Sequence, residues 1–129
     1  MLFRSHGVRL ADLLDAPGAA EVLAEVKAHG MHLEICPTSN VHTGAAASLA
    51  LHPMHRLWQA GVSLSFHTDN RLMSGTSMSR EMELLSEAFG YGLDDLQWFT
   101  VNAMKSAFLP FDERLRLIED VIKPGYESL

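Results

Sequence analysis

The sequence predicts an α/β fold in which parallel β-strands alternate with helices that cover the sheet. Three observations indicate it. Short apolar runs with a period of two residues follow segments with apolar residues at helical spacing. Glycine and proline separate these segments. The resulting order of helix, strand, helix, strand, helix is typical of βαβ units. With 47% hydrophobic residues, residues 1–129 are expected to form a single domain or part of one.

Two β-strands are expected in the first half of the chain. Residues 31–36 alternate apolar and polar side chains, and Pro37 ends the run because proline cannot donate to a β-ladder. Residues 62–67 alternate in the same way and lead into Thr-Asp-Asn at residues 68–70, which is typical of a turn. An opening strand is expected at residues 3–10. Three strands would supply about three of the eight βα units of a closed (β/α)8 TIM-type barrel.

Five helices are expected around and after these strands, because their apolar residues recur at helical spacing. They span residues 19–29, 52–60, 78–89, 94–108 and 111–123. Gly30 and Gly61 follow the first two, at the position where a left-handed residue commonly ends a helix. Residues 38–48 are polar and rich in glycine and alanine, and residues 74–77 are Gly/Ser/Thr-rich. Both stretches predict loops.

The composition excludes several classes of partner. The net charge is −6 and the lysines and arginines are scattered, so nucleic acid is not an expected partner. No apolar run reaches the roughly 20 residues that a membrane span requires. The chain does not open with the charged and apolar regions of a secretory signal, so a cytoplasmic location is expected. A single cysteine, Cys36, excludes an internal disulfide, and any metal would need His and carboxylate ligands.

Polar side chains that could bind a ligand or take part in catalysis follow the expected strands at three points. These are His6, the Ser39-Asn40 pair, and the segment from His67 to Asn70. In parallel α/β sheets and barrels the functional groups gather at the carboxyl ends of the strands. We therefore expect the three points to converge on one substrate.

Each of these residues has a functional and a structural interpretation. Asp69 suits a metal ligand or proton acceptor, or it is an ordinary turn aspartate, and the turn alternative also holds for Asn70. His67 shares a strand face with Asp69 and is a second ligand, an orienting base or a hydrogen-bonding residue. His6 polarises an attacking hydroxide or lies exposed near the chain end. Cys36 precedes a proline at an apolar strand end, which favours packing over nucleophilic chemistry.

The other histidines fit no closed zinc template. His52 precedes a proline and is expected to begin a helix, whereas His29 and His55 fall on helices and are expected at the surface. The base-flipping zinc deaminases need a Pro-Cys-x-x-Cys motif, which this sequence lacks.

Taken together, the motifs resemble the C-terminal part of adenosine deaminases over residues 5–125. The resemblance rests on LEICPTSN, Thr-Gly, His-Pro, Thr-Asp-Asn, and Asn-Ala followed by KSAFL, at residues 33–40, 43–44, 52–53, 68–70 and 102–109. It implies a (β/α)8 barrel with one zinc ion at the carboxyl ends of the strands. It also implies hydrolytic removal of the 6-amino group of a purine nucleoside, adenosine, to give inosine and ammonia.

The same resemblance implies roles for individual residues. His6 corresponds to the histidine that positions and polarises the attacking hydroxide. Asp69 corresponds to the metal ligand of the last barrel strand, which also takes a proton from the water. Asn70 lies where many members have an aspartate that hydrogen-bonds the purine ring, and an amide can donate there without being protonated first. Ser39 and Asn40 line the pocket. His67 departs from the smaller polar residue that is usual in the family.

The resemblance also implies that the other zinc ligands lie upstream of Met1. The family takes them from a His-x-His and a further histidine, with a glutamate as proton donor. One carboxylate cannot build the three-ligand site that catalytic zinc needs, so the chain alone is expected to be inactive. Two alternatives stay open. One is a non-catalytic interaction module that self-associates through an exposed barrel edge. The other is an adenine or AMP-type deaminase of the same superfamily.

Overall fold

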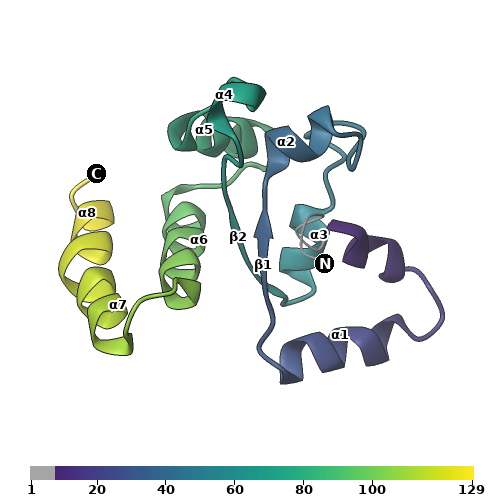
Figure 1. The fold of residues 1–129 in the computed structure, drawn as a ribbon, viewed down its shortest axis with the longest axis horizontal. Helices are drawn as coiled ribbons and strands as arrows, with labels where there is room; N and C mark the ends of the chain where they lie inside the picture. Colours follow the sequence, from purple (N-terminus) through teal and green to yellow (C-terminus); the bar gives the residue numbers. More distant parts are fainter. Residues whose placement is uncertain (1–7) are drawn as a thin grey trace.

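The computed structural model describes residues 8–129, and its centre is a two-stranded parallel sheet. Strand β1 (His32–Ile35) pairs with β2 (Ser63–Phe66), with His32 opposite Ser63 and Ile35 opposite Phe66. The helical elements are η2 (Val8–Leu13), α1 (Ala19–Ala28), α2 (Pro37–His42), α3 (Met54–Gln59), α4 (Arg71–Ser74), α5 (Met78–Phe89), α6 (Leu93–Ser106), α7 (Phe111–Leu117), η3 (Ile118–Ile122) and α8 (Lys123–Glu127). Figure 1 shows α2, α4 and α5 together beyond the carboxyl ends of the strands.

The strands predicted at residues 31–36 and 62–67 and the five predicted helices are confirmed, with ends shifted by a few residues. Helix α5 illustrates why the ends of a helix can be predicted from sequence. The Ser77 side chain accepts from the backbone N–H of Arg80 at its start, and Gly90 follows its end with φ 72°. Serine satisfies an otherwise unpaired helical N–H, and glycine adopts the left-handed conformation without steric penalty.

Three local predictions are wrong. Residues 38–48 are not wholly irregular, because α2 begins at Pro37 and runs through the polar Thr-Ser-Asn segment. The loop expected at residues 74–77 is shortened by the one-turn helix α4. The strand expected at residues 3–10 is not formed at residues 8–10, which belong to the 3₁₀ helix η2, and residues 3–7 lie outside the described part. The described residues therefore hold two strands rather than three.

Two of these differences have clear physical reasons. A strand needs a neighbouring strand to satisfy its backbone groups, whereas a 3₁₀ turn satisfies some of them locally. Proline is favoured in the first turn of a helix because its missing N–H has no intrahelical acceptor there. That preference accounts for α2, which has Pro37 in its first turn. It also accounts for Pro124 in the first turn of α8, so that the helical segment continues past residue 123, where the predicted helix ended.

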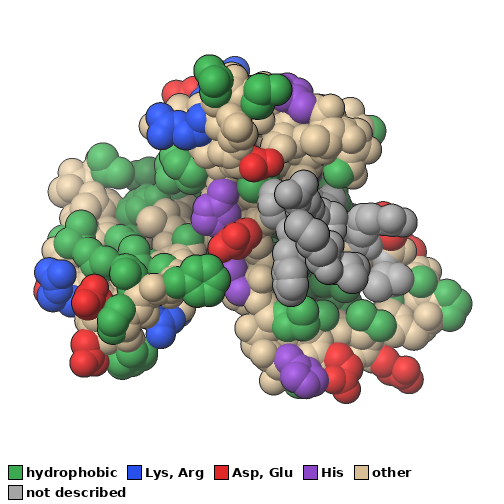
Figure 2. Space-filling view, in the orientation of Figure 1, with side chains coloured by type: hydrophobic (Ala, Val, Ile, Leu, Met, Phe, Trp, Pro, Cys, Tyr) green, Lys and Arg blue, Asp and Glu red, His purple; other side chains and the backbone are tan. Residues whose placement is uncertain are grey.

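The two faces of the sheet differ in chemistry. Leu33, Ile35, Leu64 and Phe66 are buried in the hydrophobic core, and Phe66 meets Phe99 of α6 edge to face, with ring centroids 5.5 Å apart. Strand residues alternate between faces, so polar residues lie on the other side. They are His32, Glu34, Ser63 and Ser65. Figure 2 shows histidine and acidic side chains gathered at the middle of the molecule, where the strands run. The helices within residues 8–129 are too short or too polar to span a lipid bilayer.

Candidate functional site

Parallel pairing brings the carboxyl ends of β1 and β2 to the same edge of the sheet. The backbone N–H of His67 donates to the carbonyl oxygen of Ile35 at 2.7 Å, which extends the ladder by one bond beyond β2. The segments that leave the two strands, residues 36–42 and residues 67–74, therefore start side by side. The predicted convergence of these two strand ends is present.

Asp69 and Ser39 meet across this edge. The Ser39 hydroxyl donates to Asp69 Oδ2 at 2.8 Å, and Ser39 is buried whereas Asp69 is exposed. Asp69 has φ 56°, and no other non-glycine residue in the described part has a positive φ. That left-handed conformation is strained for residues with a Cβ, although aspartate tolerates it better than most. The site therefore holds one carboxylate in a defined orientation at some cost in backbone energy.

Asn70 caps the helix that follows. Its Oδ1 accepts from the backbone N–H of Met73 at 3.0 Å, at the start of α4, and its side chain is exposed. The carbonyl oxygen of the Asn70 amide is thus used in the turn, as the structural interpretation predicted. The NH₂ group of the same amide is the donor that was expected to bind a purine nitrogen. Binding of substrate by Asn70 stays a prediction.

His6 lies outside the described residues, so its expected role in catalysis stays a prediction. The structure therefore brings together two of the three strand ends that the sequence singled out.

A chain of side-chain hydrogen bonds runs along the polar face of the sheet. His32 Nδ1 lies 2.9 Å from Ser63 Oγ, and His32 Nε2 lies 2.7 Å from Ser65 Oγ. Ser65 Oγ in turn lies 2.7 Å from His67 Nε2. Burial lowers the pKa of His32, the charge of Glu34 opposes that shift, and His67 adds to it. One ring nitrogen of His67 is thus hydrogen-bonded, while its alternatives as a second ligand or an orienting base stay predictions.

Sequence reasoning missed the network, although a signal for it was present. Ser63, Ser65 and His67 alternate along β2 and the residue after it, and His32 of β1 is the register partner of Ser63, which places the four on one face. The sequence alone does not give the register of β1 and β2, and that register is what brings these side chains into contact.

Cys36 and His52 have the structural roles that the sequence favoured. Cys36 is 3% exposed, and burial, followed by the nearby Asp69 carboxylate, raises the pKa of its thiol to about 12. A thiol protonated at neutral pH packs rather than attacks. His52 is buried, which lowers its pKa to about 4. Its Nδ1 accepts from the backbone N–H of Met54 at 3.1 Å, and its Nε2 lies 3.2 Å from Oδ1 of the buried Asn40.

His55 was expected at the surface, and this expectation is wrong. Its ring is half-buried and stacks on Phe89, with centroids 5.3 Å apart, and its Nδ1 lies 3.1 Å from the Tyr91 hydroxyl. The cause is a cluster of aromatic side chains from α3, α5 and α6. Its other members include Trp58, Trp98 and Phe99.

The side chains that could bind a metal ion determine whether residues 8–129 can form a complete metal site. In that range, no three His, Cys, Asp or Glu side chains lie close enough together to hold a metal ion. Asp69 can supply one oxygen ligand, since Ser39 occupies Oδ2 and Oδ1 is the other donor atom. The described residues fit a metal site as the contributor of a single carboxylate.

A parallel sheet with helices around it and ligand-type side chains at the carboxyl ends of its strands places the chain in the α/β class. Residues 4–124 match the family model described as adenosine deaminase, and the chain belongs to that family. It is 55% identical to adenosine deaminase 1 of Streptomyces coelicolor, over 96% of this chain and 33% of the relative. It is 54% identical to the adenosine deaminase of Mycobacterium tuberculosis H37Rv, over 96% of this chain and 35% of the relative.

Solved structures of deaminases show the same fold. Adenine deaminase from Arthrobacter aurescens superposes with a TM-score of 0.83 at 22% identity, over 95% of this chain and 35% of the other. Arabidopsis ADAL complexed with IMP superposes with a TM-score of 0.74 at 21% identity, over 84% of this chain and 32% of the other. The chain spans about a third of the length of the proteins it matches. It has the fold of the C-terminal part of a deaminase TIM barrel.

Proposed function

We propose that this chain supplies the C-terminal βα units and the carboxylate ligand of a zinc-dependent adenosine deaminase. One observation carries the proposal: the carboxylate of Asp69, just beyond the carboxyl end of β2, accepts a hydrogen bond from Ser39 of α2, the helix that follows β1. The 54–55% identity of the chain to adenosine deaminases supports it. The substrate is adenosine, and the products are inosine and ammonia.

The proposed roles follow the chemistry of each side chain. Asp69 binds the metal through oxygen and accepts a proton from the attacking water. His6 polarises the resulting hydroxide, and Asn70 donates from its amide to a ring nitrogen of the purine. Zinc, when bound, lowers the pKa of its water so that a nucleophile forms near neutral pH. The remaining ligands come from outside residues 8–129, because no three donor side chains in that range lie close enough together to hold a metal ion.

One buried, unpaired hydroxyl favours the presence of a further chain segment packed against this site. The Thr38 hydroxyl, in the residue before Ser39, is buried without a hydrogen-bond partner in the described part of the chain. A buried hydroxyl left unpaired costs about 1–3 kcal/mol. A partner from the rest of the barrel would remove that cost.

We propose the cytoplasm as the compartment, in keeping with the sequence.

Self-association is the second candidate. In the described residues β2 pairs only with β1, which leaves its other edge without a strand. A mostly apolar hollow of about 360 Å³ lies beside it, lined by Phe66, His67, Met78, Met82, Phe99, Thr100 and Ala103. A bare strand edge beside apolar surface favours pairing with another chain. Without the rest of the barrel, the chain is expected to associate with itself there.

Adenine and AMP-type substrates are the third candidate. The likenesses to adenine deaminase and to the IMP complex lie below 25% identity, so they bear on the fold and leave the substrate open. The relatives at 54–55% identity are adenosine deaminases, which favours the nucleoside.

The decisive experiment supplies the two thirds of the relatives' length that this chain does not span. This chain is fused to the upstream part of the Streptomyces coelicolor relative, loaded with zinc, and assayed with adenosine, adenine and AMP. We expect inosine from adenosine, no product from the 129-residue chain alone, and none from Asp69→Ala in the fusion. Asp94→Asn on the exposed start of α6 is the matched control and should leave the rate unchanged. A folded fusion that binds zinc but forms no inosine would refute the proposal.

A further inference from the structure

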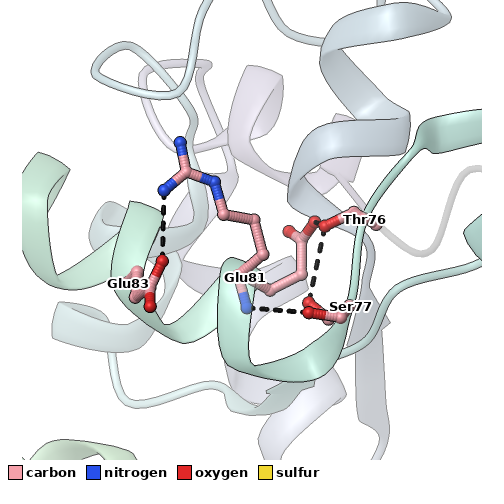
Figure 3. A network of polar contacts seen from close by, with 5 residues as sticks. Thr76, Ser77, Glu81 and Glu83 are labelled. Carbon is pink, nitrogen blue, oxygen red and sulfur yellow. Dashed lines mark hydrogen bonds and ion pairs between the residues drawn. The ribbon is translucent and has the colours of Figure 1, made fainter.

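Glu81 is a fully buried carboxylate that lies outside the predicted site. It belongs to the first turns of α5 and is 0% exposed. Figure 3 shows it directed toward Thr76, whereas Glu83 lies on another side of the same helix. Burying an ionised carboxylate is strongly unfavourable unless hydrogen bonds compensate it. Its surroundings therefore have to supply donors.

Both oxygens of Glu81 accept hydrogen bonds, and the donors come from the first turn of α2 and from the loop between α4 and α5. Oε2 accepts from the backbone N–H of Thr38 at 3.2 Å, in the segment that follows β1. Oε1 accepts from the Thr76 hydroxyl at 2.7 Å, in the segment that follows β2 and α4. One side chain thus joins the two segments that leave the carboxyl ends of the strands.

The bond to Thr38 bears directly on the predicted metal ligand. Thr38 is the neighbour of Ser39, whose hydroxyl donates to Asp69 Oδ2 at 2.8 Å. Holding the Thr38 N–H fixes the backbone from which the Ser39 side chain extends. The bond to Thr76 ties down the far end of the segment that begins at Asp69. Glu81 therefore restrains the backbone on both sides of the Ser39–Asp69 hydrogen bond.

We propose that Glu81 is a positioning residue that sets the orientation of the Asp69 carboxylate through Ser39. This inference deepens the proposed function and rests on it for its catalytic meaning. The carboxylate form matters because it offers two acceptor atoms for two donors. A glutamine at this position would offer one acceptor and would turn an NH₂ group toward the other donor. Partners that orient a metal ligand typically change metal affinity or activity by about 10- to 100-fold when removed.

The first test needs neither metal nor activity. In the full 129-residue chain, the ¹³C chemical shift of the Asp69 carboxyl is compared among wild type, Ser39→Ala, Glu81→Gln and Glu83→Gln. We expect Glu81→Gln to move the Asp69 signal in the same direction as Ser39→Ala. Glu83→Gln is the matched control, because Glu83 is exposed and paired with Arg80, and it should leave the signal in place. If Glu81→Gln does not fold, Thr76→Val removes one of the two donors at nearly constant volume and serves in its place.

The second test uses the fusion with the Streptomyces coelicolor part. We expect Glu81→Gln to lower kcat for adenosine by about 10-fold or more with little change in KM. In a Ser39→Ala background the same substitution should have little further effect, because both changes remove one orienting contact.

The outcomes separate the two proposals. A fusion of the wild-type sequence that forms no inosine overturns the proposed function, while the Asp69 signal still decides whether Glu81 positions the carboxylate. An active fusion in which Glu81→Gln behaves like Glu83→Gln overturns the inference alone. So does an Asp69 signal that Glu81→Gln leaves unchanged in a folded chain.

Discussion

Replacing Ser39 with alanine should reduce catalysis by disturbing Asp69 without removing it. The Ser39 hydroxyl is buried and donates to Asp69 Oδ2 at 2.8 Å. Hydrogen bonds to charged groups contribute about 1.5–3 kcal/mol, and we take the lower end because solvent reaches the exposed Asp69 carboxylate. A loss of about 1.5 kcal/mol in transition-state stabilisation corresponds to a roughly tenfold fall in kcat/KM.

The assay follows inosine formation by the fusion protein at saturating zinc, with bound zinc measured for each variant. We expect the loss in kcat rather than in KM for adenosine, since the serine orients a group that acts in the chemical step. Ser79→Ala, at an exposed serine on α5, is the control for a lost hydroxyl. The reasoning fails if Ser39→Ala, with its full zinc content, has the same kcat as Ser79→Ala.

Three further predictions concern the chain by itself. Asp69→Gly should be more stable than Asp69→Ala by about 1 kcal/mol in urea unfolding, because only alanine keeps the strain at φ 56°, and equal stabilities would contradict it. Cys36, with its pKa raised to about 12, should react with iodoacetamide at pH 8 only when the chain unfolds, so rapid labelling of the folded chain would count against burial. His52 has its pKa lowered to about 4 in the folded chain, so the unfolded chain takes up its proton first as the pH falls below 6.5. Stability should therefore be lost between pH 6.5 and about 4, by about 3 kcal/mol at most, and this part of the loss should be absent in His52→Ala.

The parts of the fold that the sequence predicts well are those decided by local chemistry. The strands are evident because each has one apolar and one polar face, and α5 is evident because Ser77 begins it and Gly90 follows it. Helix α2 escaped prediction because threonine, serine and asparagine compete locally with helical hydrogen bonds. In the structure two of these side chains have distant partners instead, since Ser39 reaches Asp69 and Asn40 reaches His52. Contacts 12 and 30 residues apart in sequence cannot be read from a local pattern.

The candidate metal ligand could be predicted from its residue type, whereas the residues that hold it in place could not. Asp69 was singled out because a carboxylate at a strand end suits a metal ligand. Glu81 was not, because a glutamate on a polar helix normally faces solvent. A signal was nevertheless present: Glu81 lies one helical turn before Leu85, and both are 0% exposed on the buried face of α5. A charged residue on the apolar stripe of a helix is a candidate for a buried polar contact.

The same features show why the catalytic proposal requires more chain than residues 8–129. The polar face of the sheet carries His32 and Ser65 in a hydrogen-bonded row, which a barrel interior would enclose. The hollow beside β2 is mostly apolar, and the Thr38 hydroxyl is buried without a partner in the described residues. The exposed apolar hollow and the unpaired hydroxyl are unfavourable in isolation, and further protein pairing with the free edge of β2 would relieve both. That further protein would come to lie beside Asp69, where the remaining metal ligands are needed.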